Sequence, residues 1–394
     1  MAVVPSRPLP PGIPSDWAEA RRVFEKASAG FKCGDVIHTD VKSCPGAALD
    51  MFGGCLLGSV TYFVPFYLVH IIWNAKKALS GDKEFYADLA HFYSRSIVFG
   101  GVMGLLFSTT SCTLSRLLGG FTFWTTLCVP GMCAGLAIFV EHVYRRRIVM
   151  HTFYNLALEY LYIRAQLARL VRRTATGETA FFMAVNATLL SLLHKGSATK
   201  KKTPVFWFFM PEGENKEAKT SSPKACPVPH RHSCWRSALQ VTSKYAGLAA
   251  ALQALRVVMA RGSGVVKSPG SFLGDYFSRK TGAGILSIGG YVARCLLASW
   301  YGSDNYQHSA LAGLVAGSTY WLQPNTTILT SALIATIRLL LDYLPRQLKV
   351  LHEWPMAELL FALCNGILFH ARCMDMAYCP RFIIHMMDTV TRKR

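Results

Sequence analysis

The chain has 394 residues, of which 52% are hydrophobic and 16% are charged, and its formal net charge is +20. An ordinary soluble domain carries about 25% charged residues, so this composition argues against a soluble protein and indicates that much of the chain is solvated by lipid. The basic residues stand beside apolar runs and not among interleaved aromatic residues. The excess charge therefore favours the lipid bilayer and its anionic headgroups as partners, and argues against nucleic acid.

Five runs without Asp, Glu, Lys or Arg predict the apolar helices of the chain. A helix of about 20 apolar residues can cross a hydrocarbon core about 30 Å thick. The fold expected is therefore an all-α, polytopic membrane helical bundle, in which the protein crosses the membrane several times. The uncharged runs are residues 51–75, 96–115, 117–140, 179–194 and 305–337.

The polar segment 1–50 precedes the first run. Its Pro-rich start has no apolar core, so no cleaved signal peptide is expected. Further along, the stretch FKCGDVIHTDVKSC places Cys33, His38 and Cys44 within twelve positions. Thiolates and imidazoles are the usual ligands of zinc, which takes four of them in a structural site. Asp35 or Asp40 could provide the fourth ligand.

A second patch, CPVPHRHSC, lies in the basic polar linker and again precedes an apolar segment. Its Cys226, His232 and Cys234 are further candidate metal ligands, and they could also complete one shared site with the first patch. Three interpretations of the patches stay open. They are a zinc site, a disulfide within the first patch, and ordinary loop and cap residues at the membrane surface.

The recurrence of a Cys/His patch prompts the prediction of an internal duplication. The segment PGMCAGLAIF aligns with AGLVAGSTYW, and this alignment places Gly131 and Gly135 on Gly313 and Gly317. Each pair has the small-x-x-x-small spacing that lets two helices approach closely, so the four glycines are candidate helix-packing residues.

The duplication divides the chain into four predicted regions. Two membrane helical halves, arranged as tandem repeats, are separated by the basic linker and preceded by the polar segment. The regions are the N-terminal polar segment 1–50, the first membrane half 51–195, the linker 196–236 and the second membrane half 237–394.

A helix expected at 148–171 carries polar residues on one face. His151, Asn155 and Glu159 recur every four residues, and Gln166 and Arg169 continue the same face. Such a stripe cannot face lipid. It is expected to pack against other helices, to line a water-filled path, or to lie in the membrane interface.

The second half has its own candidate pair of intramembrane polar residues. Arg338 and Asp342 are four positions apart, so on one helix they could neutralise each other. Elsewhere, no spacing of Ser, Cys, His or acidic residues matches a catalytic motif. A non-enzymatic protein is therefore expected, with no cofactor other than a possible zinc ion.

Three stretches of the sequence resemble a known family of membrane proteins. KCGDVIHTDVKSCPGAALDMFGGCLLGSVTYFVPFYLVHIIWNAKK, the HRHSC cluster and HSALAGLVAGSTYWLQPNTTILTSALIATIRLLLDY resemble the transmembrane protein 135 family over most of the chain. The N-terminal pattern of that family is similar to Cys-x4-His-x2-His-x2-Cys, and here Val41 stands in place of the second His. The resemblance implies multi-pass residence in peroxisomal or mitochondrial membranes, a role in lipid handling and mitochondrial dynamics, and no established catalytic activity.

Two functions remain as expectations. The first is a non-enzymatic organelle-membrane protein that regulates mitochondrial or peroxisomal organisation and lipid homeostasis, through protein contacts at its basic ends and Cys/His patches. The alternative is a transporter or channel for a lipid or a small metabolite, built on the duplicated halves with the polar stripes facing a central path.

Overall fold

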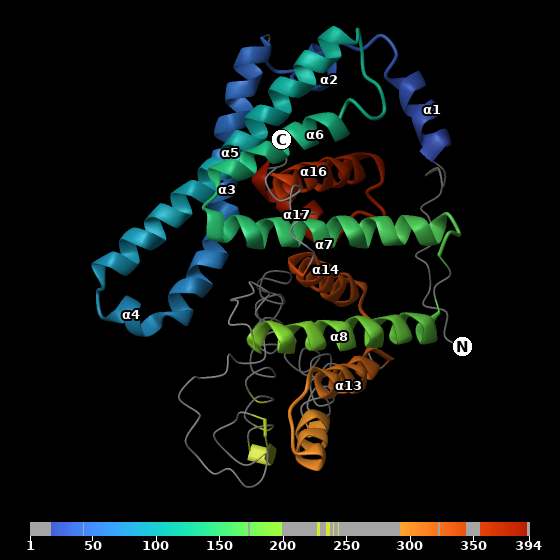
Figure 1. The fold of residues 1–394 in the computed structure, drawn as a ribbon. Helices are drawn as coiled ribbons and strands as arrows, with labels where there is room; N and C mark the ends of the chain where they lie inside the picture. The colour runs from blue at the N-terminus through green and yellow to red at the C-terminus, as the bar shows by residue number, and fades with distance from the viewer. Residues whose placement is uncertain are drawn as a thin grey trace, which may run out of the picture. The chain divides into compact units, whose positions relative to one another are not determined.

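The computed structural model describes most of the chain, and the described residues form helices joined by loops, with no strand among them (Figure 1). This result confirms the predicted all-α class. The described residues are 17–41, 43–171, 174–198, 227–228, 234–236, 239, 243, 292–321, 324–343 and 355–391.

Four of the described helices contain stretches long and apolar enough to cross a membrane, which confirms a polytopic membrane protein. These stretches are Cys44–Leu68, Lys83–Leu117, Ala175–Lys195 and Met356–Met374. The named helices are α1 (Trp17–Ala27), α2 (Cys33–Val36), α3 (Cys44–Trp73), α4 (Ala75–Leu79), α5 (Lys83–Leu117), α6 (Cys128–Gly135), α7 (Val143–Leu167), α8 (Ala175–Ala198), α13 (Tyr306–Gly317), α14 (Thr326–Asp342), α16 (Met356–Met374) and α17 (Arg381–Val390), with 3-10 turns η1 (Leu136–Val140) and η3 (Ser318–Trp321).

The chain forms two compact units. The first contains 1–171 together with 346–394, and the second contains 172–345. The units therefore divide the chain differently from the predicted sequence halves, because α16 and α17 come from the end of the chain and α8 comes from its first half.

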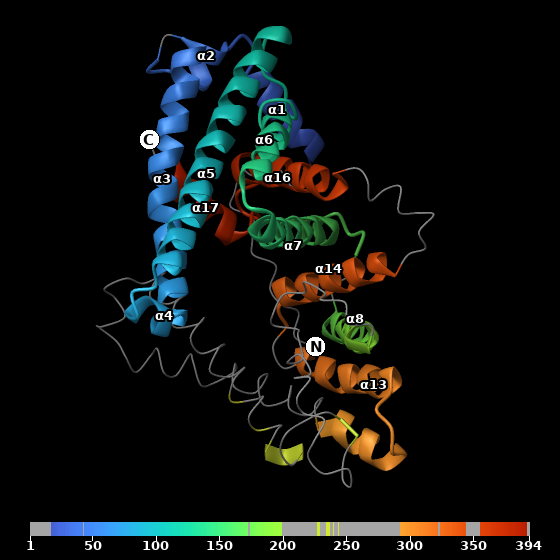
Figure 2. The same ribbon diagram turned by 60° about the vertical axis from the view of Figure 1, so that its left-hand side comes forward.

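In the first unit, α3 and α5 form a long antiparallel hairpin (Figures 1 and 2). Small residues allow their backbones to approach. A Cβ added to Gly100 would lie 1.9 Å from the Ser59 hydroxyl oxygen, and one added to Gly104 would lie 2.6 Å from the Cys55 sulfur. The connection ends at Asp82, whose carboxylate accepts hydrogen bonds from two backbone amides and so caps the start of α5. The hairpin is therefore fixed both by its contact face and by its turn.

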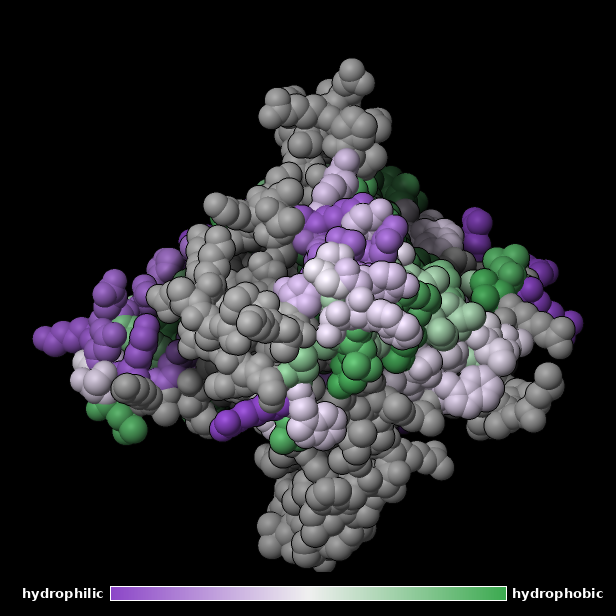
Figure 3. Space-filling model, turned by 60° about the horizontal axis from the view of Figure 1, so that its bottom comes forward, coloured by the Kyte–Doolittle hydropathy of each residue, from purple (hydrophilic) through white to green (hydrophobic). Residues whose placement is uncertain are grey.

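The other face of α3 is apolar and exposed. Leu57, Val64 and Leu68 lie on one side of the helix and are 55%, 39% and 53% exposed. Figure 3 shows hydrophobic side chains, in green, at several places on one face of the described surface. An exposed apolar stripe on a helix of spanning length is the surface that a lipid bilayer covers.

The rest of the first unit is built around α16, which lies between α6 and α7 (Figures 1 and 2). Ion pairs join α16 to α7 near both of its ends. Arg146 is 3.3 Å from Glu358, and Arg164 is 3.4 Å from Asp375. Because low-numbered residues pair with low-numbered residues, the two helices run parallel.

The second unit repeats this arrangement with different helices. There α8 lies between α13 and α14 (Figures 1 and 2). The Thr336 hydroxyl donates to the Val185 carbonyl at 3.5 Å, and the Tyr343 hydroxyl donates to the Leu192 carbonyl at 3.2 Å. Helices α14 and α8 therefore also run parallel.

Two of the uncharged runs do not form single spans. The run 117–140 begins at the end of α5, where Gly119 adopts a positive φ of 70°, and it continues as a shorter apolar helix at Cys128–Val140. The run 305–337 is divided into α13, η3 and α14. Helix α14 starts afresh because the Asn325 side chain accepts a hydrogen bond from the Thr327 amide at 3.0 Å.

Candidate metal centre

Three candidate ligands come from the segment that leads into the first span. Cys33 begins the short helix α2, His38 follows it, and Cys44 is the first residue of α3. The Asp35 carboxylate accepts a hydrogen bond from the Lys32 amide at 2.8 Å and so holds the first turn of α2. This local fold returns the chain toward α3 and brings the two cysteines together.

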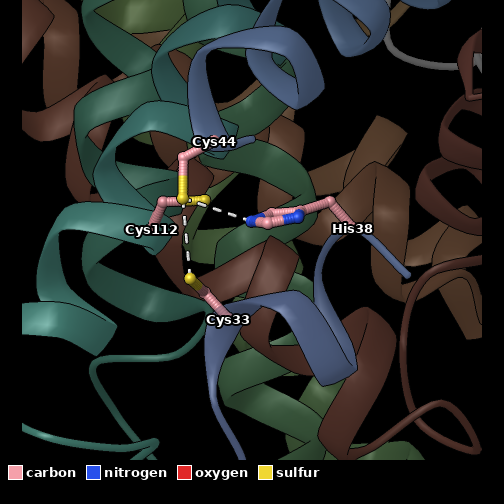
Figure 4. A group of neighbouring side chains, drawn as sticks. All are labelled: Cys33, His38, Cys44 and Cys112. Carbon is pink, nitrogen blue, oxygen red and sulfur yellow. Dashed lines mark hydrogen bonds between the residues drawn. The ribbon is translucent and has the colours of Figure 1, made fainter. Parts of the chain in front are cut away.

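The fourth candidate ligand comes from the second helix of the hairpin. Cys112 lies near the end of α5, and its sulfur joins those of Cys33 and Cys44 and the imidazole of His38 in one cluster (Figure 4). All four ligand atoms lie within 4.8 Å of one another. The Cys33 and Cys44 sulfurs are 3.6 Å apart, and His38 Nε2 is 3.2 Å from the Cys44 sulfur.

These separations match a tetrahedral zinc site. With zinc–sulfur bonds of about 2.3 Å, the sulfurs of a tetrahedron stand about 3.8 Å apart, and a sulfur and an imidazole nitrogen stand slightly closer. The Cys33–Cys44 and His38–Cys44 separations of 3.6 Å and 3.2 Å are close to these values, and the 4.8 Å limit for the whole cluster allows an excess of at most about 1 Å. A Cys3His set with four protein ligands is characteristic of a closed, structural zinc site.

The surroundings orient and balance the ligands. His38 Nδ1 is 2.8 Å from the Val41 carbonyl oxygen, so a proton on Nδ1 leaves Nε2 facing the sulfurs. Burial acts to lower the pKa of His38, but the bond to Val41 and the nearby Cys33 thiol outweigh it and raise this pKa, which makes the ring a more basic ligand. Zinc with three thiolates carries a net charge of −1, and the Arg116 guanidinium, 3.2 Å from the Cys44 sulfur, offsets it.

Apolar side chains surround the cluster. Phe121, together with Phe24 of α1 and Ile37, packs against the buried cysteines. The Ser28 hydroxyl donates to the Phe121 carbonyl at 3.4 Å, which ties the segment after α1 to the same loop. The cluster therefore fastens the N-terminal segment onto the α3–α5 hairpin.

The structure brings together only part of the predicted ligand set. Cys33, His38 and Cys44 converge, whereas neither Asp35 nor Asp40 belongs to the cluster. Cys33 and Cys44 are both free thiols, so the structure contains no disulfide between them. Cys234 lies in the second compact unit, and Cys226 and His232 lie outside the described residues.

The predicted helix-packing glycines lie at two helix crossings. A Cβ added to Gly131 would lie 2.9 Å from the Gly366 Cα, and one added to Gly135 would lie 2.6 Å from the Ala362 Cα. The Asn365 amide also donates to the Gly131 carbonyl at 2.6 Å. No side chain fits between α6 and α16 without movement of backbone.

The second crossing has the same form. In the second unit, a Cβ added to Gly313 would lie 2.7 Å from the Ala187 Cα, and one added to Gly317 would lie 2.7 Å from the Met183 Cα. Helices α13 and α8 therefore touch through backbone. The tandem duplication itself stays a prediction, although the two crossings have matching geometry.

The striped helix is α7, which begins five residues earlier and ends four residues earlier than the predicted 148–171. His151 and Asn155 are buried, whereas Glu159 is half-buried. Arg169 lies beyond the helix and is exposed, with a positive φ of 58°. There the Leu170 amide donates to the Ala165 carbonyl at 2.9 Å, in the closing turn that ends many helices.

The other predicted polar pair is only partly described. Arg338 is a half-buried residue of α14, and Asp342 is the last residue of that helix, with a side chain outside the described set.

A polar cluster that sequence reasoning missed lies between α5 and α7. Glu141 is only 1% exposed, and its carboxylate accepts from the Ser96 hydroxyl at 3.0 Å and lies 4.0 Å from the Arg145 guanidinium. The Arg145 side chain also donates to the Ser96 hydroxyl and to the Tyr67 hydroxyl. The signal in the sequence was a lone acidic residue directly after an uncharged run, four positions before an arginine.

One segment of the chain is similar to a known protein family. Residues 30–167, which hold all four ligands of the cluster, match the family model for the N-terminal cysteine-rich region of Transmembrane protein 135. No solved structure matches the chain. The match covers the segment 30–167 and shows that this part of the chain is similar to that region of the family.

Proposed function

We propose that this chain is a non-enzymatic, multi-pass protein of mitochondrial or peroxisomal membranes that regulates the organisation of these organelles and their lipid homeostasis. A zinc ion held by Cys33, His38, Cys44 and Cys112 fastens its N-terminal segment to the first two spans. The organelle and the lipid role follow from the resemblance to the transmembrane protein 135 family. The zinc site is an inference from geometry.

The observation that carries the proposal is the convergence of three ligands before the first span with one ligand from the second span. All four positions of a tetrahedron are then taken by the protein, so no position is left for a water or a substrate. Such a site supports a structural role for the metal. The exposed apolar stripe on α3 supports a hairpin placed in lipid next to this site.

Elemental analysis of the purified full-length protein tests the metal. The parent should retain zinc, and Cys112→Ser should lose the ion of this site. Cys133→Ser is the matched control, because Cys133 is a half-buried thiol of the same unit outside the cluster. Zinc content that is the same in the parent and in Cys112→Ser would refute the site.

Complementation tests the cellular role. In cells lacking the protein, the parent should restore mitochondrial length and neutral-lipid content, and so should Cys133→Ser at equal expression. Cys112→Ser should restore less, because its N-terminal segment is no longer fastened. A parent that restores neither quantity would overturn the organelle role, and a fully active Cys112→Ser would separate that role from the metal.

The transporter alternative is favoured by one observation, the burial of the polar residues His151 and Asn155 on a helix packed against α16. Buried polar positions of this kind line substrate paths in other membrane proteins. Liposomes containing the protein and a panel of small metabolites would test it. Flux that Glu159→Gln abolishes would support transport, whereas tight vesicles would exclude it for that panel.

A further inference from the structure

A hollow lies between the N-terminal helix α1 and the loop that follows α5. It is open to the surface and has a volume of about 460 Å³. Its lining residues are Ala18, Arg21, Arg22 and Glu25 of α1 and Trp124 of the loop. The four α1 residues are spaced at i, i+3, i+4 and i+7, so they share one face of the helix. A charged helix face and an aromatic ring therefore form the two walls of the hollow.

The aromatic wall is held in place by its neighbours. The Trp124 ring stacks on the His370 ring of α16, with their centroids 4.6 Å apart and an angle of 17° between them. Phe123 packs edge-on against both rings. Trp124 is still 39% exposed, so part of its surface is left for a ligand in the hollow.

Helix α1 is held against the same loop. The Phe24 ring packs edge-on against Phe123, with centroids 6.1 Å apart, and the Ser28 hydroxyl donates to the Phe121 carbonyl at 3.4 Å. These contacts fix the rotation of α1 about its own axis. They therefore determine that the face with the two arginines borders the hollow.

The two arginines are positioned to bind an anion. The Nε of Arg21 donates to the Glu25 carboxylate at 2.7 Å, and the Nε of Arg22 donates to the Ala18 carbonyl at 3.4 Å. Both bonds use Nε, which leaves the terminal nitrogens of each guanidinium for a ligand. Two arginines against one glutamate give the lining an excess of one positive charge. Terminal guanidinium nitrogens match the geometry of phosphate oxygens.

The hollow lies at the level of the bilayer surface. The loop that carries Trp124 follows α5, whose spanning stretch ends at Leu117. There Leu117 and Leu118 are 77% and 53% exposed, and such apolar side chains at the end of a span are covered by lipid. Trp is enriched at this boundary between hydrocarbon and headgroups. The anion that meets the hollow is therefore a phospholipid headgroup rather than a soluble ion.

We propose that Arg21, Arg22 and Trp124 form a binding site for the headgroup of an anionic phospholipid, with its phosphate on the two guanidinium groups. The inference rests on the proposed function for the placement of the chain in a lipid membrane, and it adds a lipid site at the N-terminal helix. Phosphatidylserine is a suitable probe, because its headgroup carries one net negative charge.

Lipid retention by the purified full-length protein tests this site. The protein is equilibrated in mixed micelles with equal amounts of phosphatidylserine and phosphatidylcholine, and the lipids that stay bound are quantified by mass spectrometry. The parent should retain phosphatidylserine in preference to phosphatidylcholine. Arg22→Gln should weaken this retention about fivefold, the effect of one basic group beside an anionic headgroup. Arg22→Lys should keep most of it.

Lys26→Gln is the matched control. It removes one positive charge from the same helix, at an exposed residue that does not line the hollow, so it should retain phosphatidylserine as the parent does. Equal losses in Arg22→Gln and Lys26→Gln would reduce the effect to general charge attraction and overturn the site. A parent without preference for phosphatidylserine would also overturn it. Displacement by soluble glycerophosphoserine as effective as that by the lipid would assign the hollow to soluble phosphates instead.

The fluorescence of Trp124 gives a second readout, which leaves both arginines unchanged. Phosphatidylserine with a spin label should quench the parent more than Trp124→Phe, whereas phosphatidylcholine with the same label should quench both proteins alike. Equal quenching of the parent by the two lipids would contradict the site. Zinc content of the same samples separates this inference from the metal site. Arg22→Gln should keep the zinc of the parent, and a parent that retains phosphatidylserine without zinc would support the lipid site alone.

Discussion

The contact of α6 with α16 yields a sharp prediction about stability. In Gly135→Ala, the new Cβ would meet the Ala362 Cα at 2.6 Å, and backbone at that distance cannot be avoided by rotating a side chain. The helices must separate by about 1 Å to restore a normal contact. Overpacking of this kind costs about 1–3 kcal/mol. The separation also lengthens the bond from the Asn365 amide to the Gly131 carbonyl, whose loss costs about 1 kcal/mol.

Alanine has a better helix propensity than glycine, which returns about 0.5–1 kcal/mol. The net expectation for Gly135→Ala is a destabilisation of about 1–3.5 kcal/mol. With about 2–4 °C per kcal/mol for a large domain, the unfolding temperature should fall by about 2–14 °C. Thermal unfolding of the full-length protein in detergent micelles measures it.

Gly54→Ala is the matched control. Gly54 is also inside an apolar helix, but a Cβ added there meets nothing within 4 Å. Its substitution should leave the unfolding temperature unchanged or raise it slightly, through propensity alone. If Gly135→Ala is as stable as Gly54→Ala, the close approach of α6 and α16 is wrong.

Three further outcomes are expected. A zinc chelator should lower the unfolding temperature of the parent more than that of Cys112→Ser, and equal shifts would count against the metal site. Asp375→Asn should cost about 3 kcal/mol, because it removes the charge that faces Arg164 and weakens the acceptor of the Tyr160 hydroxyl at 2.9 Å; unchanged thermal unfolding would contradict this. Gly317→Ala should destabilise as Gly135→Ala does, since its Cβ would meet backbone at 2.7 Å, and a silent substitution would refute that.

The apolar helices could be predicted from the sequence because lipid selects for uncharged length. Their ends were harder to predict. The break before α14 depends on one Asn side chain that accepts a hydrogen bond from a backbone amide, and the end of α7 depends on a closing turn with Arg169 at a positive φ. Such features depend on one or two residues, and they do not change the hydropathy of the segment enough to mark a helix end.

The fourth ligand was missed although its position follows from helix lengths. Cys44 begins a helix of 30 residues, and α5 returns antiparallel to it from Lys83. Counting the same length along α5 reaches Cys112, which is therefore level with Cys44. A thiol within an uncharged run is expected to behave as a small apolar residue and not as a ligand. The pairing of α3 with α5 had to be known before Cys112 could be considered as a ligand.

Which helices join each compact unit was also hard to predict, because the two glycine pairs pack on similar helices. Gly131 and Gly135 pack on Gly366 and Ala362 of α16, while the second crossing uses Ala187 and Met183 of α8 at the same spacing. Both α8 and α16 thus present small or flexible side chains, in the same register, to a glycine pair. The local sequence does not decide whether α8 or α16 packs on a given glycine pair, because the side chains of either helix would let the two backbones come close.

The helix neighbours of α16 and of α8 differ in charge. Helix α16 carries Glu358 at its start and is followed by Asp375, and these acidic groups meet Arg146 and Arg164 of α7. Helix α14 instead offers hydroxyls to the backbone of α8. Glycines thus permit the crossings, whereas ion pairs between residues more than 200 positions apart select the partner. The spacing of the glycines can be recognised along the sequence, whereas the pairing of distant charged residues cannot.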